Sequence, residues 1–183
     1  MKSKLSGLEP FDIHHLIAIF FSVFIIITIP FIGKVLQQKN RKKFIYILIS
    51  VALFQEIVDY IARYNFDGFN LAEDLPLHIC SYALFMSAYS LYFKNQFCFE
   101  FSYLLGVTGT FIAILTPEFN DFDGWVMYIT YFIHHSLIPT FSLWNIYVDG
   151  MSLRKLSIPY SLIFLAIIAL PVGIICWLTG GNY

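Results

Sequence analysis

The chain has 183 residues, of which 58% are hydrophobic and only 13% are charged, and its formal net charge is −1. An average soluble domain has roughly 25% charged residues, so this chain has too little polar surface to cover a soluble globule. It also lacks the basic field typical of nucleic-acid-binding proteins. Apolar runs of about 20 residues recur along it, and each is long enough to cross a hydrocarbon core of about 30 Å. The composition therefore predicts a polytopic membrane protein.

Six apolar segments predict six helices separated by short polar loops. Their expected bounds are residues 14–36, 44–64, 75–93, 97–116, 125–148 and 156–179. The strict alternation of a membrane β-barrel is absent from the sequence. The sequence thus predicts an all-α fold, a transmembrane helical bundle that forms a single domain over residues 1–183.

The first two helices are joined by a basic loop. Pro30 is expected to kink the first helix, and the loop, residues 37–43, follows that helix. The second helix carries Glu56 and, near its far end, Asp59 and Arg63. Asp59 and Arg63 have the i, i+4 spacing, acid first, of a helix-stabilising ion pair.

The third helix is expected to begin at Leu75. Asp74 would cap it, and Pro76 would fall in its first turn, where the missing N–H costs little. His78 and Cys80 follow within the next turn. This stretch predicts the mouth of a buried helix that carries an imidazole and a thiol.

The later helices contain small residues, prolines and a histidine pair. Gly106 and Gly109 in the fourth helix are expected to permit close helix contact. The fifth helix contains His134 and His135 and is interrupted by Pro139. Ionisable groups inside membrane helices are costly and indicate a functional site.

The distribution of cations predicts the orientation of the bundle. The loops after the first, third and fifth helices hold eight of the eleven basic residues, which are Lys34, Lys39, Arg41, Lys42, Lys43, Lys94, Arg154 and Lys155. Basic loops stay on the cytoplasmic side, so the N-terminus is predicted to lie outside. At 1.5 Å rise per residue, the candidate residues then lie in the outer half of the bundle or near its midplane: Glu56, Asp59, Arg63, His78, Cys80 and His135.

A cysteine beside a histidine is a reasonable nucleophile and base, because the thiolate is the reactive form and an imidazolium stabilises it. We expect Cys80 to be the nucleophile and His135 the base, while Glu56 orients an imidazole as the third group of a triad does. His78 and Cys80 lie roughly 200° apart on a regular helix, so they share a pocket only if the first turn is irregular. His134 is about 100° from His135, so at most one of the two is expected to face the site.

The same residues also fit purely structural roles. A free cysteine usually packs as a small hydrophobe, and a disulfide between Cys80 and Cys176 is conceivable. A zinc site of histidines with Glu56 or Asp59 is disfavoured, because HExxH is absent and adjacent histidines are not a ligand spacing on a helix. We therefore expect neither a metal nor a cofactor.

The same polar layer also fits other functions. In a transporter or a lipid-binding or small-molecule-binding protein, it would line a substrate path and relay protons. In a lipid hydrolase, water would accept the acyl group. The residues expected to bind substrate are His78, His134, Asp59 and Arg63.

Three motifs stand out along the chain: Leu75-Pro76-Leu77-His78-Ile79-Cys80, the run Gly106-Val107-Thr108-Gly109 leading to Leu115-Thr116-Pro117-Glu118, and Phe132-Ile133-His134-His135-Ser136-Leu137. Together they resemble the YwaF family of bacterial integral membrane proteins. That family is similar to the animal transmembrane protein 164 group, acyltransferases that move polyunsaturated acyl chains onto ether phospholipids. The resemblance covers residues 50–145 well.

The resemblance implies an acyltransferase that moves a fatty acyl chain between membrane lipids through a thioester on Cys80. His135 is the matching histidine, since Ser136-Leu137 follows it. The expected partners are membrane lipids, with no nucleic acid, in a multi-pass protein of a bacterial plasma membrane; the oligomeric state is left open. In the family a seventh helix begins with Asn-Tyr-Met, and this chain reaches Asn182-Tyr183 at that point.

Overall fold

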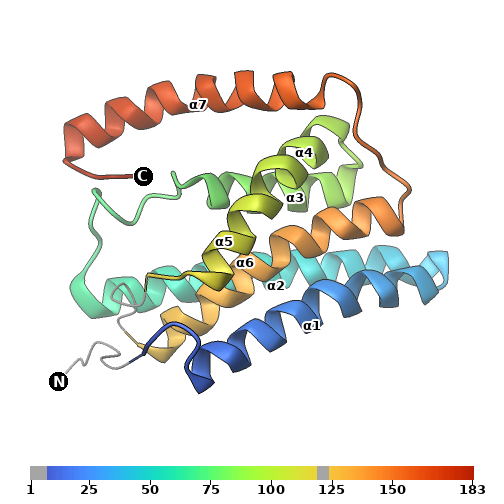
Figure 1. Ribbon diagram of the computed structural model, residues 1–183, viewed down its shortest axis with the longest axis horizontal. Coiled ribbons are helices and arrows are strands. Elements are labelled where there is room, and N and C mark those ends of the chain that lie inside the picture. The colour runs from blue at the N-terminus through green and yellow to red at the C-terminus, as the bar shows by residue number, and fades with distance from the viewer. Residues whose placement is uncertain (1–7, 119–123) are drawn as a thin grey trace.

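The computed structural model describes residues 8–118 and 124–183, and every regular element in them is helical (Figure 1). The elements are α1 (Ile13–Val35), α2 (Gln38–Asp67), α3 (Ile79–Phe93), α4 (Gln96–Phe101), the π-helix η1 (Ser102–Val107), α5 (Thr108–Leu115), α6 (Trp125–Tyr147) and α7 (Ser157–Thr179). Because α4, η1 and α5 follow one another without a break, they correspond to the fourth expected helix. The all-α bundle with six helical segments is confirmed.

Four of these segments are long and apolar enough to cross a membrane. They are α1, α2, the continuous run of α4, η1 and α5, and α7. α3 is shorter, with 15 residues. Large apolar side chains on α1 and α7 are exposed, as lipid-facing residues would be: Phe20, Phe24, Leu170 and Trp177 are examples. The structure is that of a helical membrane protein.

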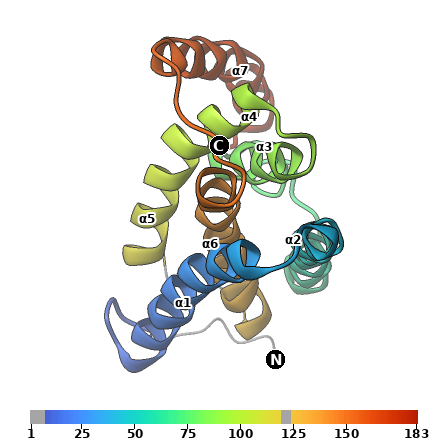
Figure 2. The same ribbon diagram turned by 90° about the vertical axis from the view of Figure 1, so that its right-hand side faces the viewer.

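The core of the bundle is built around α6. Figure 2 shows α6 between α1, α2, α3 and α5. On one side, residues such as Leu84 of α3 and Phe141 of α6 form a buried cluster with α2. On the other, Ile26 of α1 and Ile114 of α5 pack with Phe132 of α6. The two clusters leave α6 largely buried, so its polar side chains must find partners inside the protein.

Close approaches between helices explain two glycines. A Cβ atom at Gly106 would lie 2.8 Å from both Ala83 Cβ and Ile138 Cγ2, so the expected close helix contact exists at this residue. A Cβ atom at Gly33 would lie 2.1 Å from the ring of Trp144. Any side chain at either position would push helices apart.

The start of α1 is fixed by a cap and a buried histidine. The Asp12 carboxylate accepts a hydrogen bond from the His15 backbone N–H at 2.7 Å, and this bond lowers the pKa of Asp12. The His15 ring is fully buried and its Nε2 lies 2.8 Å from the carbonyl oxygen of Ile114. His15 therefore ties α1 to α5.

The second helix begins earlier than expected. α2 starts at Gln38 rather than near residue 44, so the cations of the expected loop lie in its first turns. Arg41 explains this start, since its guanidinium donates to the carbonyl oxygens of Leu36 and Lys34, both at 3.1 Å. One side chain thereby satisfies the C-terminal carbonyls of α1 across a very short turn.

The third helix begins later than expected. α3 starts at Ile79, with His78 extended at the N-cap (φ −64°, ψ 145°). The expectation that Asp74 caps this helix and that Pro76 lies in its first turn is wrong. Asp74 instead accepts from the Asn70 backbone N–H at 2.7 Å. Residues 68–78 consequently form a loop that runs from the end of α2 back into the bundle (Figure 1).

Candidate functional site

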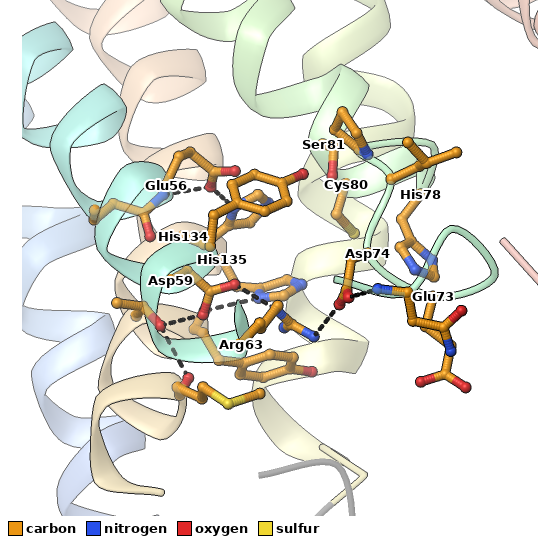
Figure 3. A pocket seen from close by; sticks show the side chains of 18 of the residues that line it. Glu56, Asp59, Arg63, Glu73, Asp74, His78, Cys80, Ser81, His134 and His135 are labelled. Carbon is orange, nitrogen blue, oxygen red and sulfur yellow. Dashed lines mark hydrogen bonds and ion pairs between the residues drawn. The ribbon is translucent and has the colours of Figure 1, made fainter. Parts of the chain in front are cut away.

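A pocket of about 760 Å³ lies among α2, α3, α6 and the loop of residues 68–78. All the candidate site residues named from the sequence line it: Glu56, Asp59, Arg63, His78, Cys80, His134 and His135. They come from three helices and a loop (Figure 3). The structure therefore brings the expected residues together, although it does not pair them as expected.

Glu56 pairs with His134 rather than with His135. The Glu56 Oε1 lies 2.5 Å from His134 Nδ1, and the Gln55 amide donates to the same oxygen at 2.5 Å (Figure 3). The side chains of Glu56 and His134 are each only 13% exposed. A carboxylate accepts hydrogen bonds, so Nδ1 of His134 is the donor in this contact.

His135 is held by a backbone carbonyl one helical turn away. Its Nδ1 lies 2.8 Å from the carbonyl oxygen of Tyr131, which can only accept, so Nδ1 carries the proton. The Tyr131 ring packs on the imidazole, with the ring centroids 4.2 Å apart. His135 is buried but lines the pocket. Its Nε2 is therefore the basic atom, in a ring whose orientation is fixed.

The expectation that only one of the two adjacent histidines faces the site is wrong. Both line the pocket, and their ring centroids are 4.9 Å apart. The pocket covers the side of α6 that lies between α2 and α3. Two adjacent residues of a helix point about 100° apart, and this side is wide enough for both side chains to reach the pocket.

Arg63 is held between two carboxylates. Its Nε donates to Asp59 Oδ2 at 2.6 Å, which confirms the i, i+4 pair, and its Nη1 lies 3.8 Å from Asp74 Oδ1. Thr130 of α6 donates to the other oxygen of Asp59 at 2.6 Å. This network attaches the loop of residues 68–78 to α2 and α6 along one wall of the pocket.

Cys80 and His78 share the pocket because the chain is not a regular helix between them. Cys80 lies in the first turn of α3, whereas His78 precedes the helix in extended conformation. The irregular start removes the 200° separation that a regular helix would impose. His78 is exposed and packs against the ring of Tyr183, with the centroids 5.1 Å apart.

The Cys80 thiol faces α5 as well as the pocket. A Cβ atom at Gly109 would have Cys80 Sγ as its nearest neighbour, at 3.9 Å. Cys80, Cys98 and Cys176 are all free thiols, so the conceivable disulfide between Cys80 and Cys176 is absent. Among the residues that the structure describes, no three metal-binding side chains are grouped closely enough to hold an ion.

The residues after α7 close one side of the pocket. Tyr183 Oη donates to the carbonyl oxygen of Leu71 at 2.6 Å and accepts from the backbone N–H of Leu75 at 3.2 Å. Asn182 lines the pocket. The C-terminal residues thus pack on the loop that carries His78.

Sequence reasoning missed several of these partners. Tyr131 had a local signal, since it lies four residues before His135 and a helical carbonyl at that spacing is within reach of a side chain. Gln55 had only its position next to Glu56. Thr130 and Tyr183 had no signal, because their contacts join segments far apart in the sequence.

Taken together, the pocket contains a thiol, two imidazoles whose Nδ1 atoms are engaged by oxygen acceptors and a layer of ion pairs. A free thiol with a nearby base can accept an acyl group, and His135 can accept a proton at Nε2. The ion pairs hold the elements that carry these groups.

The comparisons with known proteins identify a family for the chain. The model of the TMEM164 family matches residues 10–183. No curated protein and no solved structure matches the chain. The match spans all the elements that line the pocket, and on this ground the chain belongs to the TMEM164 family.

Proposed function

We propose that this protein is an acyltransferase of the YwaF type, which moves a fatty acyl chain between membrane lipids through a thioester on Cys80. His135 would take the thiol proton at Nε2, and the thiolate would attack the ester carbonyl of the donor lipid. The leaving alkoxide would take that proton back. We also propose that the protein is a multi-pass protein of the cell membrane with its N-terminus outside.

The observation that carries this proposal is the presence of Cys80 and His135 on one pocket, with His135 held as a base. Its Nδ1 is bonded to the Tyr131 carbonyl, so Nε2 is the atom left to accept a proton. The free space at Gly109 beside the sulfur supports the proposal, since an acyl group on Cys80 needs room. Membership of the TMEM164 family agrees with it.

The test is to trap the acyl-enzyme. The protein, reconstituted in vesicles, is incubated with a phospholipid labelled in its fatty acyl chains, and the protein-bound label is tested for release by hydroxylamine. We expect labelling of wild type and of Cys98→Ser/Cys176→Ser, and none of Cys80→Ser. His135→Ala should slow labelling by about 100-fold or more, the usual contribution of a general base. Equal labelling of Cys80→Ser and wild type would contradict the thioester.

A second candidate, a transporter or lipid-binding protein, is favoured by the ion-pair layer of Asp59, Arg63 and Asp74 along the pocket wall. In that case binding or transport would depend on Asp59 and Glu56 and would be indifferent to Cys80. Measuring both lipid binding and acyl transfer for Asp59→Asn and Cys80→Ala separates the two functions, because Cys80→Ala abolishes transfer in an acyltransferase that uses this thiol, whereas in a binding protein or transporter only the Asp59 change has an effect.

A further inference from the structure

Among the residues that the structure describes, four side chains that line the pocket carry a hydroxyl group, and two of these groups are already engaged. Thr130 donates to a carboxylate of α2 at 2.6 Å, and Tyr131 donates to a backbone carbonyl of α5 at 3.0 Å. The hydroxyls of Tyr60 and Ser81 have no hydrogen-bond partner in the described part of the chain. These two donors are therefore available to a molecule bound in the pocket.

Tyr60 differs from the other side chains of its wall, because they are tied to one another. The face of α2 toward the pocket consists of Gln55, Glu56, Asp59, Tyr60 and Arg63. Gln55 donates to Glu56 at 2.5 Å, and Arg63 donates to Asp59 at 2.6 Å. Tyr60 is half-buried between these pairs. A phenol is protonated at neutral pH and can donate one hydrogen bond, and a shielded tyrosine hydroxyl usually has a partner. The free hydroxyl of Tyr60 thus suits a bound ligand.

Ser81 lies next to the proposed nucleophile. It follows Cys80 in the first turn of α3, and both side chains line the pocket (Figure 3). A serine or threonine inside a helix often donates to the carbonyl oxygen four residues earlier, as Thr108 does at 3.0 Å. The residue four positions before Ser81 is Leu77, which precedes the helix. Ser81 therefore has no helical carbonyl at this spacing, and its hydroxyl stays free.

An attack on an ester needs hydrogen-bond donors at the carbonyl oxygen as well as a nucleophile and a base. When a thiolate adds to the carbonyl carbon, the π electrons of the carbonyl move onto its oxygen, which becomes an oxyanion. Donors held at that oxygen stabilise the transition state more than the bound ester and so raise the rate. Arg63 is already held between two carboxylates. The two free hydroxyls are therefore the better candidates for this role.

We propose that the hydroxyls of Tyr60 and Ser81 form the oxyanion hole of the acyl transfer through Cys80. Tyr60 donates from α2 and Ser81 from α3, which are two walls of the same pocket. The sulfur–carbon bond forms as the oxygen gains its charge. The carbonyl re-forms as the lipid alkoxide leaves and takes the proton from the His135 imidazolium. Transfer to an acceptor hydroxyl runs through the same tetrahedral intermediate in reverse, so the two donors act equally in both directions.

This inference rests on the proposed function, and comparing two reactions of the same thiol tests it. Protein carrying Cys98→Ser/Cys176→Ser in vesicles is treated either with a phospholipid labelled in its acyl chains or with iodoacetamide. Iodoacetamide alkylates the thiolate at a saturated carbon, so no oxyanion forms. We expect Tyr60→Phe and Ser81→Ala each to slow acylation by about 100-fold and to leave alkylation unchanged. His135→Ala should slow both reactions, because each needs the thiolate. The loss in the hydroxyl variants should lie in the maximal rate rather than in the half-saturating lipid concentration.

The matched controls are Tyr64→Phe and Ser50→Ala, the same changes at exposed residues of α2 outside the pocket. They should leave both reactions unchanged. Unimpaired alkylation of the Tyr60 and Ser81 variants shows in the same experiment that they are folded and keep a reactive thiol. Acylation at the parent rate, or equal slowing of acylation and alkylation, would overturn the oxyanion hole while leaving the thioester intact. Failure of the parent protein to be acylated would overturn the proposed function and this role with it.

Discussion

The Cys80 thiol has space beside it because residue 109 has no side chain. The nearest atom to a Cβ built at Gly109 is Cys80 Sγ, at the ordinary van der Waals distance of 3.9 Å. Gly106, one turn earlier in the same run, has no such space, since its Cβ would collide with α3 and α6. The two glycines therefore serve different purposes, one for packing and one for room at the site.

We predict that Gly109→Leu blocks long-chain access to Cys80. An alanine should be tolerated, but a leucine would fill the volume next to the sulfur. With a long-chain thiol-reactive probe, labelling of Cys80 should slow several-fold in Gly109→Leu, whereas a small methanethiosulfonate should react nearly as in wild type. The control is Gly173→Leu on α7, where a Cβ would have no neighbour within 4 Å. Equal slowing with both reagents would mean that the leucine distorts the site.

The link between α6 and α7 is anchored on a buried carboxylate of α4. Glu100 is fully buried, and it binds the Arg154 guanidinium through two contacts of 2.8 Å and accepts from its backbone N–H at 3.1 Å. Gln96 donates to the same carboxylate at 2.7 Å. The hydrogen bonds that the Arg154 side chain donates to Glu100 raise the pKa of Arg154. Arg154 is itself half exposed, so removing Arg154 and removing Glu100 should lower the free energy of unfolding by different amounts.

We predict that Arg154→Ala destabilises the protein more than Glu100→Gln. Removing the arginine leaves a charge buried without its partner, which is strongly unfavourable, whereas removing the carboxylate leaves an arginine that water can reach. The double variant should recover part of the loss. Thermal unfolding in detergent gives the order, with the exposed neighbour Lys155→Ala as the control. An equal effect of both single variants would contradict this account.

Helices were easier to predict than the points where they begin. Long apolar segments can be recognised from their composition, and all six helices were predicted. The start of α3 was misplaced because Asp74 and Pro76 are good local signals for a helix N-terminus. In the folded chain Asp74 is engaged by Arg63 and Asn70 instead, and tertiary contacts outweigh a local preference.

The members of the candidate site were predictable, but their pairing was not. Depth along the helices placed Cys80, His135 and Glu56 in the same half of the bundle, and all three line the pocket. Which imidazole meets Glu56 depends on the rotation of α2 and α6 about their axes, a quantity that spacing along one helix does not contain. The pair of Glu100 and Arg154 was not predicted either, because it joins α4 to the link between α6 and α7, two segments far apart in the sequence.

The two ends of α7 hold the molecule together in different ways. Near its start, Phe164 packs edge-on against Phe97 and Phe101 of α4. Beyond its end, Gly181 lies so close to the loop of residues 68–78 that a Cβ there would be 2.3 Å from the carbonyl oxygen of Ala72. The middle of the helix is largely exposed. Residues 180–183 therefore act as a strap that fixes the loop at the pocket.

We predict that loosening this strap exposes Cys80. Gly181→Ala should push residues 180–183 off the loop, and Tyr183→Phe should remove two hydrogen bonds worth about 1 kcal/mol each. In protein carrying Cys98→Ser/Cys176→Ser, both changes should speed the reaction of Cys80 with a small thiol reagent. Gly173→Ala and Tyr160→Phe are the matched controls, since both lie on α7 away from the loop and should leave the rate unchanged. If neither Gly181→Ala nor Tyr183→Phe alters the rate, the loop is held by Arg63 and Asp74 alone, and the strap has no part in shaping the pocket.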